Sequence, residues 1–389
     1  MLISCLCVLG VVAFTNAKAI KDSLDDIPYD LLLKLKELAA QYDYPDYYTG
    51  PEPDDASGAL REVPNWPTER TRPLIGQVGG LAVDSEGQVV VFHRAERRWD
   101  ASSFVFNRLN PALGPIKGDV FLKLLPESGE VLSQFGGGQF YMPHGLTLDA
   151  DDNMWITDVG LHQVMKIPKG STTPSLVLGV KMEPGSDDTH FCKPTDVAVA
   201  STGEFFVADG YCNSRILKYS SSGTLLTKWG RPMSGTRAPE VDQLYIPHSL
   251  ALVENKDLIC VADRENSRIQ CFDAGLNGTT AGTFRKSLQP NRGTIYAIEY
   301  DPNSDVIYVV NGPGMNDIIE GFTLDLDGNI LETWGPRGTP MEHPHDVTVS
   351  RDGINVYAGD IGQDPRVYKF ERPYGMAKTA GTPPYAIIG

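Results

Sequence analysis

The sequence predicts an all-β fold, a six-bladed β-propeller, because one short apolar strand pattern occurs six times along the chain. The copies begin at Gly80, Gly145, Asp196, Ser249, Ala297 and Asp346. Each copy is followed by a turn that contains Asp or Gly, and then by further apolar runs that are typical of strands. Repeats at intervals of roughly 50 residues indicate a propeller or a solenoid. Four antiparallel strands per repeat favour the propeller, in which closure of the ring protects the strand edges.

The third copy shows the plan of one blade. Residues 196–200 predict the first strand and residues 204–208 the second, with a turn at Gly203 between them. The third and fourth strands are predicted at residues 215–219 and 225–229. In such a blade, the loop between strands two and three emerges on the same side as the start of strand one. Residues at these two places therefore surround one mouth of the central channel.

The composition limits the kinds of partner. A chain of 389 residues with 41% hydrophobic residues can bury a large core. Its formal net charge of -16 disfavours nucleic acid, because phosphate binding needs clustered Lys and Arg. No stretch beyond the first 19 residues is long and apolar enough to span a bilayer. We therefore predict neither a nucleic-acid partner nor a membrane span.

The two ends of the chain differ from the repeats. Residues 1–19 are predicted to be a secretory signal peptide, since a short apolar run ends there in small residues. Residues 20–73 are predicted to form an extension with one amphipathic helix over residues 29–42, where Leu recurs at helical spacing. The propeller is then expected over residues 74–372, followed by a tail over residues 373–389. This organisation predicts a protein that is secreted or lies in the lumen of a secretory granule.

Cysteine usage agrees with an oxidising compartment, because an even set of four remains after the signal. Four cysteines allow three different disulfide pairings. Cys192 and Cys212 fall on the same face of one blade, and Cys260 and Cys271 flank a hairpin of the next, so we predict these two pairs. The only glycosylation sequon begins at Asn277 in a Gly-rich loop, where we expect an oligosaccharide; an unused sequon is the alternative.

Three histidines precede alternate copies of the repeat, each in the dipeptide Pro-His. They are His144, His248 and His345, whereas the other copies are preceded by Gly79, Thr195 and Tyr296. Alternate blades would present three imidazoles around the channel axis. Three imidazoles without a fourth protein ligand are typical of a catalytic zinc site, which keeps one position open. His93, His162 and His190 lack this equivalence, and we interpret them as hydrogen-bonded structural residues.

Several stretches of the chain resemble known families. The loops 209–215 and 263–268 resemble those of NHL-type repeats. The following stretches resemble peptidyl-α-hydroxyglycine α-amidating lyase: Phe92-His-Arg94, Pro143-His-Gly-Leu146, Thr157-Asp-Val, Cys192-Lys-Pro-Thr-Asp196, Ala208-Asp-Gly-Tyr-Cys-Asn-Ser-Arg215, Pro247-His-Ser-Leu-Ala-Leu252, Val261-Ala-Asp-Arg-Glu-Asn266 and Pro344-His-Asp346. The resemblance covers about residues 76–370. No part resembles the copper monooxygenase to which this lyase is fused in many animals, which implies a free-standing lyase coupled to a separate copper peptidylglycine monooxygenase.

The resemblance also implies two metal sites. Zinc would be held by His144, His248 and His345. Calcium would be held in the channel by the carboxylate of Asp346 and by the backbone carbonyls of Leu81 and Leu146, since oxygen ligands suit this ion. We interpret Asp196, at the position equivalent to Asp346, as a turn-forming residue.

The implied reaction cleaves a peptide that ends in α-hydroxyglycine into a peptide amide and glyoxylate, as in the maturation of neuropeptides and peptide hormones. Tyr211 would be the proton-transfer group, because a nearby cation favours the ionised form of a phenol. Arg94 would assist Tyr211 or bind substrate, and Arg264 would bind the terminal carboxylate through its planar fork. All three lie in loops between strands two and three, on the same face as the histidines.

Two other functions fit parts of the sequence. A non-catalytic NHL-like propeller that binds a secreted peptide or protein would explain the blades but not the alternating histidines. A calcium-dependent lactonase-like propeller would be expected to line its channel with carboxylate and Asn ligands, so it ranks third. His343 departs from the family, which commonly carries an apolar residue there; we interpret it as a surface variation, with a hydrogen-bond donor near the pocket as the alternative.

Overall fold

The computed structural model describes residues 59–233, 238–313, 318–338 and 340–373. The predicted signal peptide, the predicted helix over residues 29–42 and the predicted tail beyond residue 373 lie outside these ranges. Within them the structure is built from strands, with three short 3-10 turns, η2 (Arg72–Leu74), η3 (Glu254–Lys256) and η4 (Arg264–Asn266). No helix in the described part of the chain has the length and apolar character needed to cross a membrane.

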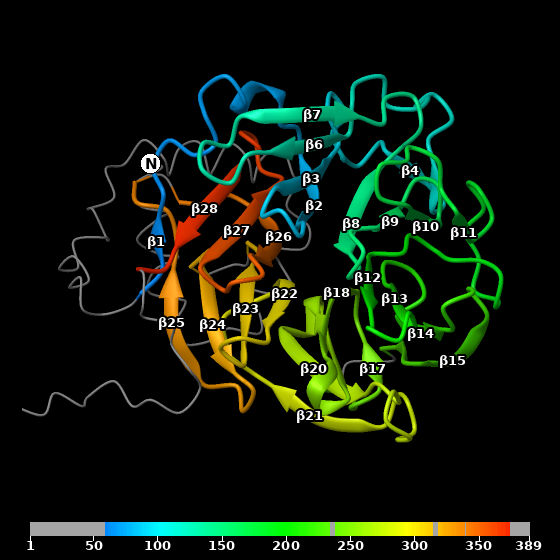
Figure 1. Cartoon of the computed structure of the whole chain (residues 1–389). Coiled ribbons are helices and arrows are strands. Elements are labelled where there is room, and N and C mark those ends of the chain that lie inside the picture. Colours follow the sequence, from blue (N-terminus) through cyan, green and yellow to red (C-terminus); the bar gives the residue numbers. More distant parts are fainter. Residues whose placement is uncertain (1–58, 234–237, 314–317, 339, 374–389) are drawn as a thin grey trace, which may run out of the picture. The chain divides into compact units, whose positions relative to one another are not determined.

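Six four-stranded antiparallel sheets are arranged around a central axis, as the sequence predicts (Figure 1). Blade 1 consists of β2 (Val78–Val83), β3 (Val89–His93), β6 (Phe121–Leu124) and β7 (Val131–Phe135). Blade 2 consists of β8 (Pro143–Leu148), β9 (Met154–Asp158), β10 (Gln163–Ile167) and β11 (Leu176–Leu178). Blade 3 consists of β12 (Asp196–Val199), β13 (Phe205–Asp209), β14 (Arg215–Tyr219) and β15 (Leu225–Trp229).

The other three blades follow the same order from the channel outward. Blade 4 consists of β18 (Pro247–Val253), β19 (Leu258–Asp263), β20 (Arg268–Asp273) and β21 (Phe284–Leu288). Blade 5 consists of β22 (Ile295–Asp301), β23 (Val306–Asn311), β24 (Gly321–Asp325) and β25 (Ile330–Trp334). Blade 6 consists of β26 (Pro344–Val349), β27 (Asn355–Asp360), β28 (Val367–Glu371) and β1 (Arg61–Glu62). Two small ribbons lie between blade strands: β4 (Phe104–Val105) with β5 (Arg108–Leu109), and β16 (Arg231–Pro232) with β17 (Gln243–Leu244).

The outermost strand of blade 6 comes from the N-terminal side of the propeller. Arg61 pairs with Glu371 and Glu62 with Phe370, so the start of the domain closes the ring against its end. This corrects the expected boundary at residue 74, because residues assigned to the extension contribute a blade strand. A two-residue strand has no apolar alternation that could reveal it in the sequence.

The inner strands are apolar because neighbouring blades pack face to face. Residues of blades 3 and 4, for example, share one buried cluster that includes Phe206, Ile216, Leu250 and Val261. Interdigitation of this kind keeps the six first strands close together around the channel. The first residues of these six strands therefore lie at the channel mouth.

Both predicted disulfides are present. Cys192 and Cys212 join the start of blade 3 to its loop between strands two and three. Cys260 and Cys271 are direct cross-strand partners on β19 and β20. Asn277 is exposed in the loop between β20 and β21.

Candidate metal centre

A buried aspartate positions the segment that precedes the first strand in most blades. Asp158 accepts hydrogen bonds from the backbone N–H groups of Tyr141 and Met142, just before His144. Asp360 does the same for His343. Asp209 and Asp263 occupy the equivalent position at the end of their second strands. A carboxylate that accepts backbone donors fixes these segments, so the Pro-His dipeptides start from a defined position.

The backbone is irregular at each histidine. The pairing of strands one and two shifts register between Pro143 and Leu146, between Pro247 and Leu250, and between Pro344 and Asp346. A β-bulge of this kind redirects a side chain relative to the regular alternation of a strand. The irregularities therefore explain how a histidine and the residue after it can both face the channel.

The structure brings His144, His248 and His345 together, as the sequence predicts. Their rings lie 4.6–4.8 Å apart between centroids, and one potential ligand nitrogen from each falls within 4.8 Å of the others. The three side chains are only 1–2% exposed. Because their ring nitrogens converge on one point, they form a ready set of three nitrogen donors for a metal ion.

Each imidazole is oriented by the backbone of the next blade. Nδ1 of His144 bonds to the carbonyl of Thr195 at 2.8 Å, that of His248 to Tyr296 at 2.6 Å, and that of His345 to Gly79 at 3.0 Å. These acceptors are the residues that stand in the histidine position of blades 3, 5 and 1. A carbonyl partner fixes Nδ1 as the protonated nitrogen, which leaves Nε2 with its lone pair for a metal.

Electrostatics keep these rings in the form that a metal requires. Burial lowers the pKa of all three imidazoles well below the usual value, and positive neighbours such as Arg94 add to the effect. Neutral imidazole is the form of histidine that ligates metal. The site is therefore prepared to bind a cation at neutral pH without first losing protons.

Tyr211 reaches the same point from blade 3. Its hydroxyl lies 3.0 Å from Nε2 of His144 and 3.3 Å from Nε2 of His248. The residue follows β13 and is adjacent to Cys212, whose disulfide to Cys192 ties this loop to the start of the blade. Tyr211 thus presents a fixed phenol beside the open side of the three imidazoles.

Arg94 is buried next to Tyr211, at 1% exposure. Its Nε donates to the carbonyl of Pro143 at 3.1 Å and its Nη1 to the side-chain oxygen of Gln77 at 3.0 Å. No described residue accepts a hydrogen bond from Nη2. Burial lowers the pKa of Arg94 to about 10, so the group still carries its charge at neutral pH. It therefore offers one unused donor inside the site.

Arg264 also lies next to Tyr211. Its guanidinium carbon is 5.4 Å from the ring centroid of Tyr211 and 4.8 Å from that of Tyr296. Its Nε donates to Glu265 at 2.8 Å. The predicted site residues Tyr211, Arg94 and Arg264 are therefore all at the triad, as their positions in the blade plan require.

A second layer of polar groups lines the channel beyond the histidines. It consists of the carboxyl groups of Asp196, Glu299 and Asp346, which are partly buried and surrounded by protein. Burial raises the pKa of Asp196 to about 7 and that of Glu299 to about 8. Burial also raises the pKa of Asp346 well above its usual value, and repulsion from Asp196 and Glu299 adds to the effect. A cavity of about 10 Å³, bordered by the three histidines together with Asp196 and Asp346, connects the two layers.

This layer corrects the interpretation of Asp196 as a turn residue. Asp196 accepts a hydrogen bond from the N–H of Leu250 in the next blade at 2.8 Å, and Asp346 accepts one from Leu81 at 2.6 Å. The two aspartates therefore make the same contact between neighbouring first strands. Leu81 does lie next to Asp346, and Gly80 packs against the backbone of Leu146 so closely that a Cβ would clash.

Comparison with known proteins agrees with this architecture. The NHL repeat family matches residues 191–219 and 244–272. A Drosophila melanogaster protein named peptidyl-alpha-hydroxyglycine alpha-amidating lyase 2 is 42% identical over 319 residues, which cover 79% of this chain and 74% of the relative. The chain belongs to the peptidyl-α-hydroxyglycine α-amidating lyase family.

Longer relatives contain this lyase-family region as one part. The Rattus norvegicus peptidylglycine alpha-amidating monooxygenase is 43% identical over 331 residues, which cover 82% of this chain and 33% of the relative. The chain thus spans about a third of the length of such relatives. A solved gluconolactonase from Xanthomonas campestris has a TM-score of 0.53 at 13% identity, covering 77% of this chain and 88% of that one, which shows the shared fold alone.

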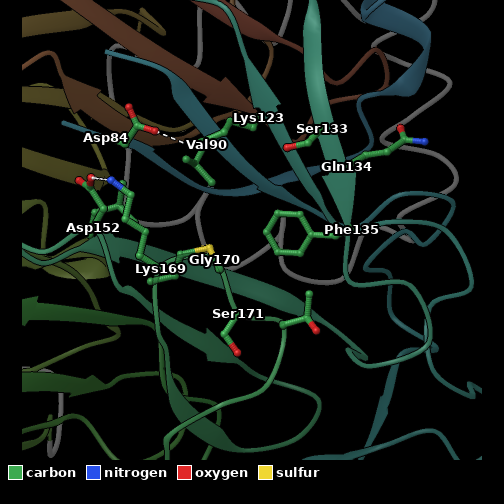
Figure 2. A pocket seen from close by; sticks show the side chains of 13 residues that line it. Asp84, Val90, Lys123, Ser133, Gln134, Phe135, Asp152, Lys169, Gly170 and Ser171 are labelled. Carbon is green, nitrogen blue, oxygen red and sulfur yellow. Dashed lines mark hydrogen bonds and ion pairs between the residues drawn. The ribbon is translucent and has the colours of Figure 1, made fainter. Parts of the chain in front are cut away.

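A larger cavity in this lyase-family chain lies away from the triad. It has a volume of about 350 Å³ and is bordered by Phe135 and by two ion pairs, Lys123 with Asp84 at 2.7 Å and Lys169 with Asp152 at 2.9 Å (Figure 2). None of the predicted site residues lines it. Because the charged side chains that border this cavity are already paired, the histidine triad is the stronger candidate for the functional site.

Sequence reasoning missed several residues of the site. Gln77 orients Arg94 and also accepts the backbone N–H of Trp99. Trp99 packs against Tyr211 with ring centroids 5.0 Å apart. Tyr296 stands in the histidine position of blade 5, which was the one available signal. His343, interpreted as a surface variation, instead bonds to the hydroxyl of Tyr296 at 2.8 Å.

Proposed function

We propose that this protein is a zinc-dependent peptidylamidoglycolate lyase, which converts a peptide ending in α-hydroxyglycine to a C-terminal amide and glyoxylate. The observation that carries the proposal is the convergence of three neutral imidazoles and the Tyr211 hydroxyl on one point, in a chain of this family. The names of the relatives support the reaction, and the donor set supports the metal.

The three Nε2 atoms fit zinc, because zinc accepts imidazole ligands and catalytic sites commonly leave one position open. His144, His248 and His345 would hold the ion, each kept in one tautomer by a backbone carbonyl. When bound, zinc would polarise the hydroxyl oxygen of the substrate and make its proton easier to remove.

Cleavage requires one proton to leave and another to arrive. The hydroxyl O–H bond breaks, its carbon–oxygen bond becomes the aldehyde of glyoxylate, the C–N bond breaks, and the amide nitrogen gains a proton. Tyr211 is within hydrogen-bond distance of two of the imidazoles, so its oxygen can exchange a proton with a group bound there. This position supports a role for Tyr211 both in removing the hydroxyl proton and in delivering a proton to the amide nitrogen.

The two arginines would bind and orient the substrate. Nη2 of Arg94 is an unused donor in a buried setting, where a charged hydrogen bond is strong. Arg264 would bind the carboxylate of the terminal hydroxyglycine through its fork of terminal nitrogens. Substrate held between these groups would keep its hydroxyl oxygen and amide nitrogen next to Tyr211.

A calcium ion is proposed for the carboxylate layer. Asp346 and the backbone carbonyls of Leu81 and Leu146 would be the ligands, with Asp196 and Glu299 adding negative charge nearby. Three carboxyl groups facing one narrow channel repel one another when ionised, so a hard divalent cation fits this donor set.

The biological setting is also a proposal. A secreted or granule-lumen protein agrees with two disulfides and with the exposed sequon at Asn277. Its substrates would be peptides hydroxylated at a C-terminal glycine by a separate copper peptidylglycine monooxygenase. Maturation of neuropeptides and peptide hormones would be the corresponding process.

The test is glyoxylate release from a synthetic peptide that ends in α-hydroxyglycine, measured with the mature chain before and after chelation and zinc addition. We expect metal-dependent release. His190→Ala is the matched control, because His190 lies outside the triad and bonds to Asp187. A folded, zinc-loaded protein that releases no glyoxylate would contradict the lyase and favour a propeller that binds secreted peptides.

A further inference from the structure

Two residues of the site depart together from the internal repeat. In blade 5, Tyr296 occupies the position before the repeated strand pattern that is Gly79 in blade 1 and Thr195 in blade 3, the other two blades without a histidine there. His343 stands two residues before His345, where the other Pro-His segments carry the apolar residues Met142 and Ile246. A polar residue has therefore been placed at each of two positions that face each other across neighbouring blades.

The two side chains form a defined pair. Nε2 of His343 lies 2.8 Å from the hydroxyl of Tyr296, with the rings nearly perpendicular at a centroid distance of 5.0 Å. The backbone of His343 is fixed on both sides, since its N–H donates to Asp360 and its carbonyl accepts from Ile361. The histidine is thus a rigid anchor for the phenol.

The ring of Tyr296 contacts the guanidinium group of Arg264. The guanidinium carbon lies 4.8 Å from the centroid of the Tyr296 ring, closer than to the ring of Tyr211. Nε of Arg264 is engaged by Glu265, so the paired terminal nitrogens form the edge that can meet a carboxylate in two parallel hydrogen bonds. A guanidinium over an aromatic face is held by its charge, which makes its position depend on that of the ring.

We propose that Tyr296 and His343 are a positioning pair that holds Arg264 where it binds the carboxylate of the terminal hydroxyglycine. This deepens the proposed lyase function and rests on it. The hydrogen bond between His343 and Tyr296 fixes the tilt of the Tyr296 ring, and the ring face fixes the guanidinium. Small displacements of a positioning group are costly, because binding energy depends on a defined geometry.

The test measures binding of a carboxylate directly, without turnover. The probes are N-acetylphenylalanylglycine and its C-terminal amide, which lack the hydroxyl and so are not cleaved. Their dissociation constants are measured by calorimetry on the zinc-loaded protein, and the ratio of amide to acid isolates the contribution of the carboxylate. We expect the unmodified protein to prefer the acid.

Tyr296→Phe keeps the ring and His343→Met restores an apolar residue, and each removes the anchoring hydrogen bond. Each is expected to lower the preference for the acid by about 3- to 30-fold, the range for losing one contact to a charged group. In turnover, KM should rise while kcat changes little. His343→Gln keeps a hydrogen-bonding group toward Tyr296 and is expected to retain most of the preference.

Tyr300→Phe is the matched control. It removes a hydroxyl from the same strand, β22, where Tyr300 bonds to Asp305 at 2.8 Å away from the triad. It should leave the ratio unchanged. If Tyr296→Phe and His343→Met keep the full preference at native zinc content, or if the unmodified protein does not prefer the acid, the pair has no positioning role. Preference for the acid in a protein that releases no glyoxylate would instead overturn the lyase alone.

Discussion

The channel has two layers of titratable side chains, and they respond to burial in opposite directions. At the mouth, burial lowers the pKa of the three imidazoles and keeps them neutral. One to three residues further along the first strands, burial raises the pKa of Asp196, Glu299 and Asp346. In both layers the charged form is disfavoured, as expected where water is scarce.

The difference explains which metal chemistry each layer can support. Neutral imidazoles donate lone pairs and need no counter-charge, so the mouth suits zinc with an open position for substrate. The carboxyl groups become good ligands only when ionised, so the second layer depends on a cation to stabilise its own charge. We therefore expect the mouth to determine activity and the second layer to determine stability. Four experiments test this separation.

The largest effect is expected from His144→Ala. Removing one of three ligands should abolish zinc binding and lower glyoxylate release by at least as much as loss of a proton-transfer group, about 10²–10⁴-fold. Metal content by mass spectrometry and release under saturating substrate measure the two effects. Calcium content should match that of His190→Ala. A variant that lost zinc but kept its rate would remove zinc from the mechanism.

Tyr211→Phe separates proton transfer from metal binding within the mouth. The variant keeps the ring that Trp99 and Arg264 contact, so zinc content and substrate affinity should be retained. We expect kcat to fall about 10²–10⁴-fold because the proton-transfer group is lost. Steady-state kinetics measure kcat and KM, and zinc analysis of the same sample measures metal content. An unchanged kcat would assign proton transfer to another group.

Asp346→Asn addresses the second layer. An amide can still accept the hydrogen bond from Leu81, but it removes the charge that calcium requires. In the unmodified protein, calcium at 100 times its dissociation constant should stabilise the fold by about 2.7 kcal/mol. Calorimetry with calcium and with chelator should show this difference, and the variant should lack it. Equal stabilisation of both proteins would place calcium elsewhere.

The smallest effect is a dependence of stability on pH. The pKa of Glu299 is raised to about 8 and that of Asp196 to about 7 in the folded protein. The folded state therefore holds protons that the unfolded state has already lost, and this stability disappears as the pH rises through these values. Metal-free protein should lose on the order of 1–2 kcal/mol between pH 7 and pH 9, after allowance for channel water.

Glu299→Gln provides the control for this effect, since its amide cannot ionise. It should remove much of the slope between pH 7 and pH 9, and calcium should flatten the curve of the unmodified protein. Denaturant unfolding at several pH values measures both. Histidines contribute little in this window, because the pKa of His93 and of His162 is lowered to about 4. A flat curve in metal-free protein would show that the carboxyl groups stay ionised without a cation.

Features that repeat along the chain, or that lie within one blade, could be predicted from the sequence. Six copies of one strand pattern predicted six blades, and Pro-His in alternate copies predicted the triad. Equivalent positions in a repeat must occupy equivalent places around the axis, so the pattern carries three-dimensional information. The cysteine pairs were predictable for the same reason, since each lies within one blade.

The contacts between blades could not be predicted from the sequence and are known from the folded structure. The bond between Tyr296 and His343, the orientation of each imidazole by the next blade, and the strand that β1 adds to blade 6 all join residues far apart in sequence. Asp196 illustrates the physical reason. Whether its side chain faces a turn or the channel depends on the twist and register of packed strands, and one residue of register reverses the face of a strand.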